Sequence, residues 1–124
     1  MRSLAIALTL AGALLTTAAA ADEDVMTAGD LQQLCAGTDH VSVNVCRVYI
    51  LGVTEGIALG MNIADGKTKD GRPCVPRGMS GDKLEATVKK KLDALASATD
   101  RDADASQLIG AELTSTFPCR KADQ

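Results

Sequence analysis

The chain has 124 residues, a formal net charge of −3 and 23% charged residues. It contains no tryptophan and only one residue each of tyrosine, phenylalanine and histidine. A chain of this length forms about one small domain, and its core must depend on aliphatic side chains. Lysines and arginines are scattered along the sequence, which argues against a nucleic-acid partner.

The N-terminus has the layout of a secretory signal peptide. Arg2 precedes an apolar stretch over residues 4–15, and small residues ending at Ala21 form an Ala-x-Ala cleavage site. We expect residues 1–21 to be removed by cleavage near Ala21, which leaves residues 22–124 as the mature domain. A retained anchor is the alternative, but the apolar stretch is shorter than the ~20 residues that cross a bilayer. The sequence therefore predicts an exported domain with no stable membrane anchor.

Four cysteines, Cys35, Cys46, Cys74 and Cys119, lie in the mature part, and export would place them where disulfides form and persist. We predict two disulfides and no metal site, because no Cys-x-x-Cys motif occurs and His40 is the single histidine. Three pairings are possible. We favour the first two cysteines as one pair, across a tight turn, and the last two as the other, across a long loop. In the chain-entropy model each bridge contributes about 3 to 4 kcal/mol.

Helical patterns cover most of the mature domain, so we predict an all-α fold, a small bundle of about four helices stapled by two disulfides. Thr27, followed three residues later by a carboxylate, is typical of a capped helix start, and this helix should end near Gly37. Another helix should begin after Ser80. The last should cover residues 105–116, capped by the acidic loop before it.

The most apolar stretch runs from Ser42 or Asn44 to Met61, and its spacing fits a helix that is buried on much of its circumference. Gly52, Gly56 and Gly60 occupy every fourth position there and form a strip without side chains. We interpret this strip as a place where another helix of the same protomer approaches closely. The alternative is a contact between two copies of the chain.

No group of residues indicates catalysis, and we predict a binding protein that is not an enzyme and has no cofactor. His40 lies in a turn without an implied partner, and a nucleophile needs a base within hydrogen-bond reach. Asp100, Asp102 and Asp104 are close in sequence, but carboxylates in an exposed loop more often cap helices. A Gly-Lys-Thr sequence at residues 66–68 lacks the upstream glycine of a phosphate-binding loop.

Four motifs, taken in order, resemble the Rap/Tai-type immunity family. They are Gly29-Asp-Leu-x-x-Leu-Cys35; Cys46-Arg-Val-Tyr-Ile-Leu-Gly-Val53; Cys74-Val-Pro76 before the helix that starts after Ser80; and Ala105-x-x-Leu108 leading to Phe117-Pro-Cys119. The resemblance covers essentially the whole mature chain. It implies an all-helical periplasmic protein with two disulfides, often dimeric. It further implies that the protein binds a peptidoglycan amidase effector of type VI secretion and inhibits it sterically.

Two polar loops are the candidate partner-binding elements under this interpretation, because both are expected to protrude and neither has a core role. The first has the charged residues Asp65, Lys67, Lys69 and Asp70, and the second has Asp100, Arg101, Asp102 and Asp104. The sequence does not choose between them. We expect the acidic second loop to complement a basic rim on the partner.

Two other functions stay open at the level of sequence. One is a periplasmic holdase or scaffold that binds partly unfolded proteins through apolar surface. A single histidine argues against a sharp switch near neutral pH for such a protein. The other is a carrier of a small apolar ligand inside the bundle. We favour this function least, because the core is so small.

Overall fold

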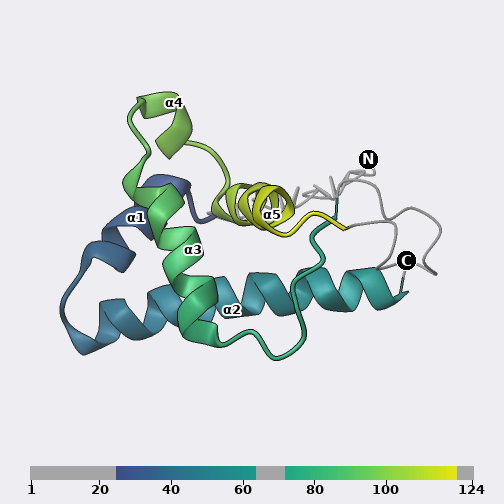
Figure 1. Ribbon diagram of the computed structural model, residues 1–124. Helices are drawn as coiled ribbons and strands as arrows, with labels where there is room; N and C mark the ends of the chain where they lie inside the picture. The colour runs from purple at the N-terminus through teal and green to yellow at the C-terminus, as the bar shows by residue number, and fades with distance from the viewer. Residues whose placement is uncertain (1–24, 64–71, 120–124) are drawn as a thin grey trace, which may run out of the picture.

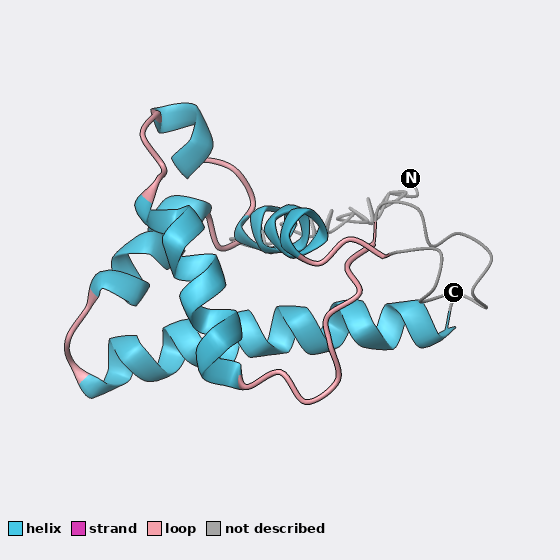
Figure 2. Ribbon diagram, in the orientation of Figure 1, coloured by secondary structure: helices cyan, strands magenta, loops and turns pink. Residues whose placement is uncertain are grey.

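The computed structural model describes residues 25–63 and 72–119. This part contains five helices and no strand: α1 (Ala28–Ala36), α2 (His40–Ile63), α3 (Gly81–Asp93), α4 (Ala98–Arg101) and α5 (Ala105–Thr116) (Figure 1, Figure 2). The predicted all-α fold is confirmed. The predicted signal peptide over residues 1–21 lies outside the described residues.

The predicted helix starts are confirmed at three side chains that accept hydrogen bonds from backbone N–H groups. Thr27 accepts from the N–H of Asp30, whose carboxylate accepts in return from the Thr27 N–H and completes a capping box. Ser80 accepts from the N–H of Lys83, and Asp104 accepts from two N–H groups at the start of α5. These contacts satisfy donors that have no partner inside the helix.

Two elements differ from the prediction. α2 begins at His40 rather than at Ser42 or Asn44, because the Asp39 carboxylate accepts from the N–H groups of the two residues that follow His40, at 3.1 and 3.0 Å. The second polar loop, predicted without structure, begins with the single helical turn α4. Ser97 caps that turn by accepting from the N–H of Asp100 at 3.0 Å.

The core lies between α2 on one side and α1, α3 and α5 on the other (Figure 1). α2 is 24 residues long and runs along the lower edge of the figure, while the shorter helices lie above it. The buried apolar residues are Ala28, Leu31, Cys35, Cys46, Ile50, Leu84, Val88, Leu92, Leu95, Ala105, Ile109 and Leu113. Because α2 supplies only two of these, most of its surface faces away from the core.

Both predicted disulfide pairings are confirmed. Cys35–Cys46 joins the end of α1 to α2 over 11 residues, and Cys74–Cys119 ties the segment before α3 to the end of α5 over 45 residues. Cys35 and Cys46 are 5% and 1% exposed, whereas Cys74 and Cys119 are both half-buried. The first bridge therefore belongs to the core, and the second lies at its edge.

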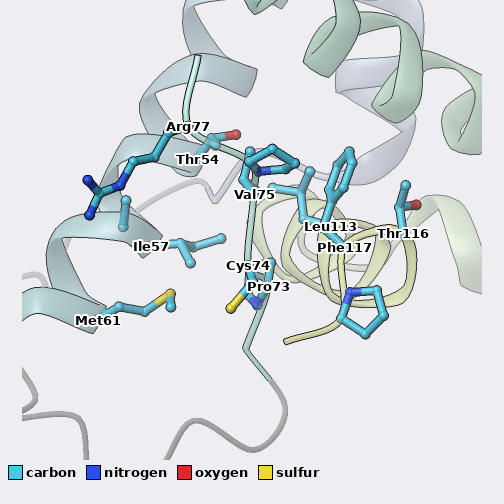
Figure 3. A pocket seen from close by; sticks show the side chains of 13 residues that line it. Thr54, Ile57, Met61, Pro73, Cys74, Val75, Arg77, Leu113, Thr116 and Phe117 are labelled. Atoms are coloured by element: carbon cyan, nitrogen blue, oxygen red, sulfur yellow. The ribbon is translucent and has the colours of Figure 1, made fainter. Parts of the chain in front are cut away.

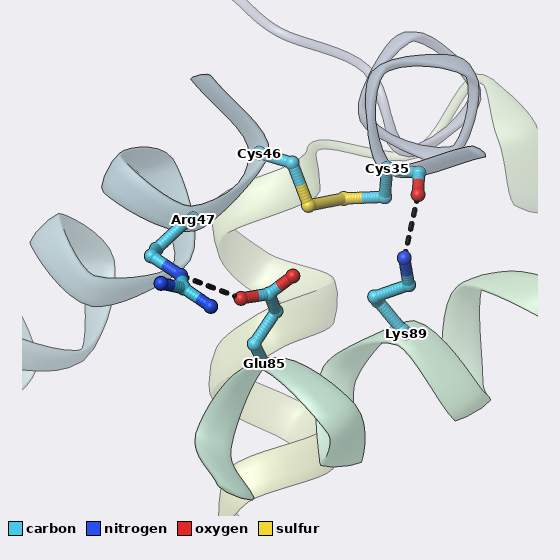
Figure 4. The surroundings of a disulfide bond; sticks show 5 residues. All are labelled: Cys35, Cys46, Arg47, Glu85 and Lys89. Atoms are coloured by element: carbon cyan, nitrogen blue, oxygen red, sulfur yellow. Dashed lines mark hydrogen bonds and ion pairs between the residues drawn. A yellow bond between two sulfur atoms is a disulfide. The ribbon is translucent and has the colours of Figure 1, made fainter. Parts of the chain in front are cut away.

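Long polar side chains tie the helices together around the first disulfide (Figure 4). The Lys89 ammonium donates to the carbonyl of Cys35 at 2.7 Å, and the Gln32 amide donates to the carbonyl of Leu92 at 2.6 Å. Both carbonyls lie near the C-terminal end of a helix, and the Leu92 carbonyl also accepts from the N–H of Leu95 at 3.1 Å. Arg47 of α2 pairs with Glu85 and Asp82 of α3. α1, α2 and α3 are thus held in one arrangement.

Candidate functional site

The outward side of α2 is mostly apolar, with one exposed charged residue, Glu55, seven residues after Val48. Helical geometry places Val41, Val45, Val48, Gly52, Gly56 and Leu59 on the side opposite the buried Cys46 and Ile50. We call these six residues the outer face of α2. Val41, Val48 and Leu59 are 71%, 68% and 60% exposed. By length and composition, His40–Met61 is apolar enough to cross a membrane. Only 11% of the most apolar 18-residue window of this helix is buried inside the protein. α2 is therefore not a helix enclosed by its own protomer.

The predicted packing of the glycine strip against another helix of the same protomer is wrong, and α2 is less buried than the predicted burial on much of its circumference. Gly52, Gly56 and Gly60 are all exposed. A Cβ atom placed on any of the three would have no neighbour within 4 Å. α1, α3 and α5 pack on the side of α2 that carries Cys46 and Ile50. The described residues therefore leave the glycine strip uncovered.

The second predicted partner-binding loop lies at the far end of the bundle, at the top of Figure 1, where α4 packs on α1. Two backbone hydrogen bonds hold its base: the N–H of Ala28 donates to the carbonyl of Ala103 at 2.7 Å, and the N–H of Ala105 donates to the carbonyl of Met26 at 3.0 Å. The loop is thus a fixed protrusion from the core.

The four charged residues of this loop divide into two pairs with different roles. Asp100 accepts a hydrogen bond from the Ser97 hydroxyl at 2.6 Å, and Asp104 accepts from the Ser106 hydroxyl at 2.7 Å. These hydrogen bonds lower the pKa of each carboxyl below its ordinary value. Arg101 and Asp102 are exposed and make no ion pair within the part of the chain that the structure describes. Asp104 therefore caps α5, and Asp100 accepts from the hydroxyl of Ser97, the cap of α4, whereas Arg101 and Asp102 make no such contact within the described residues.

The first predicted loop, with Asp65, Lys67, Lys69 and Asp70, lies outside the described residues. The chain on either side of it lines an apolar groove of about 830 Å³ between α2, residues 73–77 and the end of α5. Figure 3 shows Ile57 and Met61 of α2 on one side of this groove, with Val75, Leu113 and Phe117 on the other. The Cys74–Cys119 disulfide and a 2.7 Å hydrogen bond from the Cys74 N–H to the Phe117 carbonyl fix its far wall.

Sequence reasoning missed this groove, because its walls come from three segments that are distant in the chain. Arg77 is the one charged residue in the lining, and in sequence it is a single arginine between a proline and a glycine. The only signal was the pair of prolines, Pro73 and Pro76, which excluded a helix at the wall.

No constellation for catalysis or metal binding is present among residues 25–63 and 72–119. These residues contain no cluster of three or more His, Cys, Asp or Glu side chains that could hold a metal ion. All four cysteines are in disulfides, and His40 is exposed at the first turn of α2. The site features of this part of the chain are an apolar face, a charged protrusion and a groove, which are features of binding.

The fold and these surfaces define a small, disulfide-stapled helical protein of the binding class. A family model described as Rap1a immunity proteins matches residues 27–119. The chain therefore belongs to the Rap1a immunity protein family, and the matched region spans all five helices and both disulfides. Comparison with curated proteins and with solved structures found no match. Membership of this family indicates a role in immunity against a secreted effector protein.

Proposed function

We propose that this protein is a periplasmic immunity protein that binds a peptidoglycan amidase effector of type VI secretion and blocks its active site sterically. The observation that carries the proposal is the match of the immunity family to the whole described domain. Two disulfides fit an exported protein. Steric inhibition fits a chain whose described residues offer binding surfaces and no catalytic group.

The protrusion that carries Arg101 and Asp102 is the element we assign to the effector contact. Its base is held by backbone hydrogen bonds, so little ordering is needed when a partner binds, and this favours affinity. Its two exposed charges can be recognised by opposite charges at the rim of an enzyme cleft. Asp65, Lys67, Lys69 and Asp70 form a second proposed contact.

The proposal also includes self-association: the protein is a homodimer, as the resemblance implies and as the exposed glycines of α2 permit. One protomer of a dimer can contact an effector while the other fixes its orientation.

Inhibition of hydrolysis tests the immunity function. The oxidised mature domain, residues 22–124, is mixed with purified type VI amidase effectors, and release of soluble peptidoglycan fragments is followed. We expect a one-to-one complex of effector and protomer that silences one amidase. If every amidase stays active while many unfolded proteins bind weakly, the holdase function replaces the immunity function.

A charge-reversal pair tests the assigned protrusion. Arg101→Glu with Asp102→Lys keeps the net charge and should slow association with the amidase about tenfold, with a smaller effect on dissociation. Lys90→Glu with Asp93→Lys is the matched control on the exposed side of α3. Equal association rates for the two double variants would move the contact away from this protrusion.

A further inference from the structure

The groove beside the second disulfide has a wall that is fixed without any ligand. The Cys74–Cys119 bridge and the hydrogen bond from the Cys74 N–H to the Phe117 carbonyl hold the wall at residues 73–77. Pro73, which is buried, and Pro76 restrict the backbone of the same wall. The volume of about 830 Å³ falls within the range of roughly 300–1,000 Å³ that is usual for small-molecule sites. A ligand of that size would bind with little rearrangement of the protein.

The lining of this groove is apolar along its length. Ile57 and Met61 of α2 lie on one side, with Val75, Leu113 and Phe117 on the other (Figure 3). All of these except Leu113 are only half-buried in the protein. A ligand that covers them therefore removes further apolar surface from water, and the flexible thioether of Met61 can adapt to its shape.

The mature chain itself has no apolar segment left to fill the groove. Its parts outside the described residues are residues 22–24, 64–71 and 120–124. They contain no valine, leucine, isoleucine, methionine or aromatic residue. The occupant is therefore another molecule.

The backbone of the walls offers little to a peptide. Pro73, Pro76 and Pro118 line the groove and have no N–H group. The N–H of Cys74 is bonded within the protein, so the Val75 N–H is the one remaining donor between residues 73 and 76. A bound peptide buries main-chain N–H and C=O groups that need partners. The groove thus suits a ligand without a polar backbone.

Arg77 supplies the single charge of the lining and has no partner there. The hydroxyls of Thr54 and Thr116, the other polar side chains of the lining, donate to the Ile50 carbonyl and the Glu112 carboxylate. Arg77 is exposed and makes no ion pair or hydrogen bond within the part of the chain that the structure describes. Figure 3 shows Arg77 on the side of Thr54, away from the far end of the α2 wall. Apolar length is thus combined with one positive charge toward one end.

We propose that this groove binds a medium-chain fatty acid, with its acyl chain along Ile57 and Met61 and its carboxylate at Arg77. A guanidinium matches a carboxylate in charge and geometry, because two of its N–H groups can donate in parallel. From Thr54 to Met61 the α2 wall is about 10 Å long, which suits an acyl chain of medium length. This inference does not depend on the immunity function. The ligand would lie beside the core, so the small size of the core does not limit it.

Titration of the isotope-labelled, oxidised mature domain with sodium decanoate, followed by NMR below the critical micelle concentration, tests the site. The N–H signals of Ile57, Val75 and Phe117 should shift and saturate, with a Kd on the order of 100 µM. The signals of Val48 and Gly52, on the outer face of α2, should not move. Decyltrimethylammonium, which has the same chain and the opposite charge, should bind at least fivefold more weakly. Because the protein has a net charge of −3, non-specific adsorption would favour this cation instead.

Variants of the lining separate the roles of the apolar wall and the charge. Ala58→Asp places a carboxylate in the lining and should weaken decanoate binding at least tenfold. Leu59→Asp is the matched control, because the neighbouring Leu59 is exposed and lies outside the lining. Arg77→Gln should weaken decanoate binding about threefold and remove its preference over the ammonium, whereas Arg77→Lys should keep that preference. Circular dichroism melts show whether each variant folds.

The outcomes are distinct from those of the amidase assay. The inference is overturned if no groove signal shifts through the millimolar range, if the shifts lie on the outer face of α2, or if the ammonium binds as well as decanoate. If Ala58→Asp abolishes amidase inhibition and decanoate leaves the groove signals unchanged, the groove belongs to the effector, which also overturns it. A domain that binds decanoate in the groove but inhibits no amidase keeps this inference and loses the proposed function.

Discussion

Hydrogen bonds from single side chains stabilise the helix ends in this protein. Thr27 and Asp30 form a reciprocal capping box at the start of α1, and Lys89 and Gln32 satisfy carbonyls at two C-terminal ends. In a domain with so small a core, each of these contacts is a sizeable fraction of the total stability.

Replacing Thr27 by alanine should lower the free energy of unfolding by about 1 kcal/mol, because the N–H of Asp30 loses its acceptor. Guanidinium denaturation followed by circular dichroism measures the change. Thr38→Ala is the control: Thr38 is exposed and its side chain makes no hydrogen bond within the described part of the chain. Equal stability of the two variants would mean that water replaces the cap without loss.

Three carboxylates make the protein sensitive to acid. Hydrogen bonds from Ser42, Ser97 and Ser106 lower the pKa values of Asp39, Asp100 and Asp104 below the ordinary value of 3.8. A carboxyl whose folded pKa is depressed stabilises the fold above its unfolded pKa, and this stabilisation is lost as the pH falls through the folded pKa.

We therefore expect the denaturation midpoint to decrease from about pH 4 downward. Asp104→Asn should flatten part of this decrease, because an asparagine accepts the same hydrogen bonds without titrating. Denaturant titrations at several pH values measure both curves. Identical acid limbs for the wild type and this variant would show that the Asp104 cap is not part of the response.

At the scale of helices, the sequence predicts the helix ends, which depend on local rules. It does not predict how much of each helix is covered, which depends on packing. The caps at Thr27, Ser80 and Asp104 were predicted because each depends on residues only two or three positions apart. The apolar spacing at positions 46, 49, 50, 53 and 57 predicts the face of α2 that packs on the core, and this face is confirmed. The exposure of the rest of α2 was not predicted, since valines and glycines occur all around this helix. α4 was missed because a single turn capped by Ser97 has no periodic pattern.

The loops of the candidate site follow the same division. Nothing in the order of Asp100, Arg101, Asp102 and Asp104 says which carboxylates are engaged as caps, because that depends on where α4 and α5 begin. The groove beside the second disulfide depends on three segments meeting, which no local pattern records. The sequence permits three disulfide pairings, and the pairing favoured from the tight turn and the long loop is the one that forms.

Glycine-to-alanine substitutions distinguish an open glycine from a tightly packed one. Gly60→Ala should stabilise the monomer by about 0.5–1 kcal/mol, because it restricts the unfolded chain and meets no neighbour. Gly37→Ala should destabilise it by about 1–3 kcal/mol, since its Cβ would lie 2.5 Å from the Cβ of Ser42. Thermal and denaturant unfolding at low micromolar concentration compares them. A loss of stability in Gly60→Ala would show that this position is covered in the monomer.

At the scale of the whole molecule, the two disulfides stabilise a small hydrophobic core in different ways. The loop of 11 residues closed by Cys35–Cys46 corresponds to about 3 kcal/mol in the chain-entropy model, and the loop of 45 residues closed by Cys74–Cys119 corresponds to about 4 kcal/mol. The second bridge stabilises more by loop length, yet it is the one that solvent reaches. The first bridge ties α1, on which α4 packs, to α2, and the second fixes one wall of the groove.

Limited reduction should therefore open the bridges in a fixed order. A thiolate must reach a disulfide sulfur to attack it, and Cys74 and Cys119 are half-buried while Cys35 and Cys46 are buried in the core. We expect dithiothreitol, followed by alkylation and mass spectrometry, to give first a species labelled at Cys74 and Cys119 that is still helical. The variant Cys74→Ala with Cys119→Ala should match that species, with unfolding about 4 kcal/mol easier than in the wild type. Simultaneous reduction of both bridges, or prior reduction of Cys35–Cys46, would mean that the whole domain unfolds before either bridge is reached.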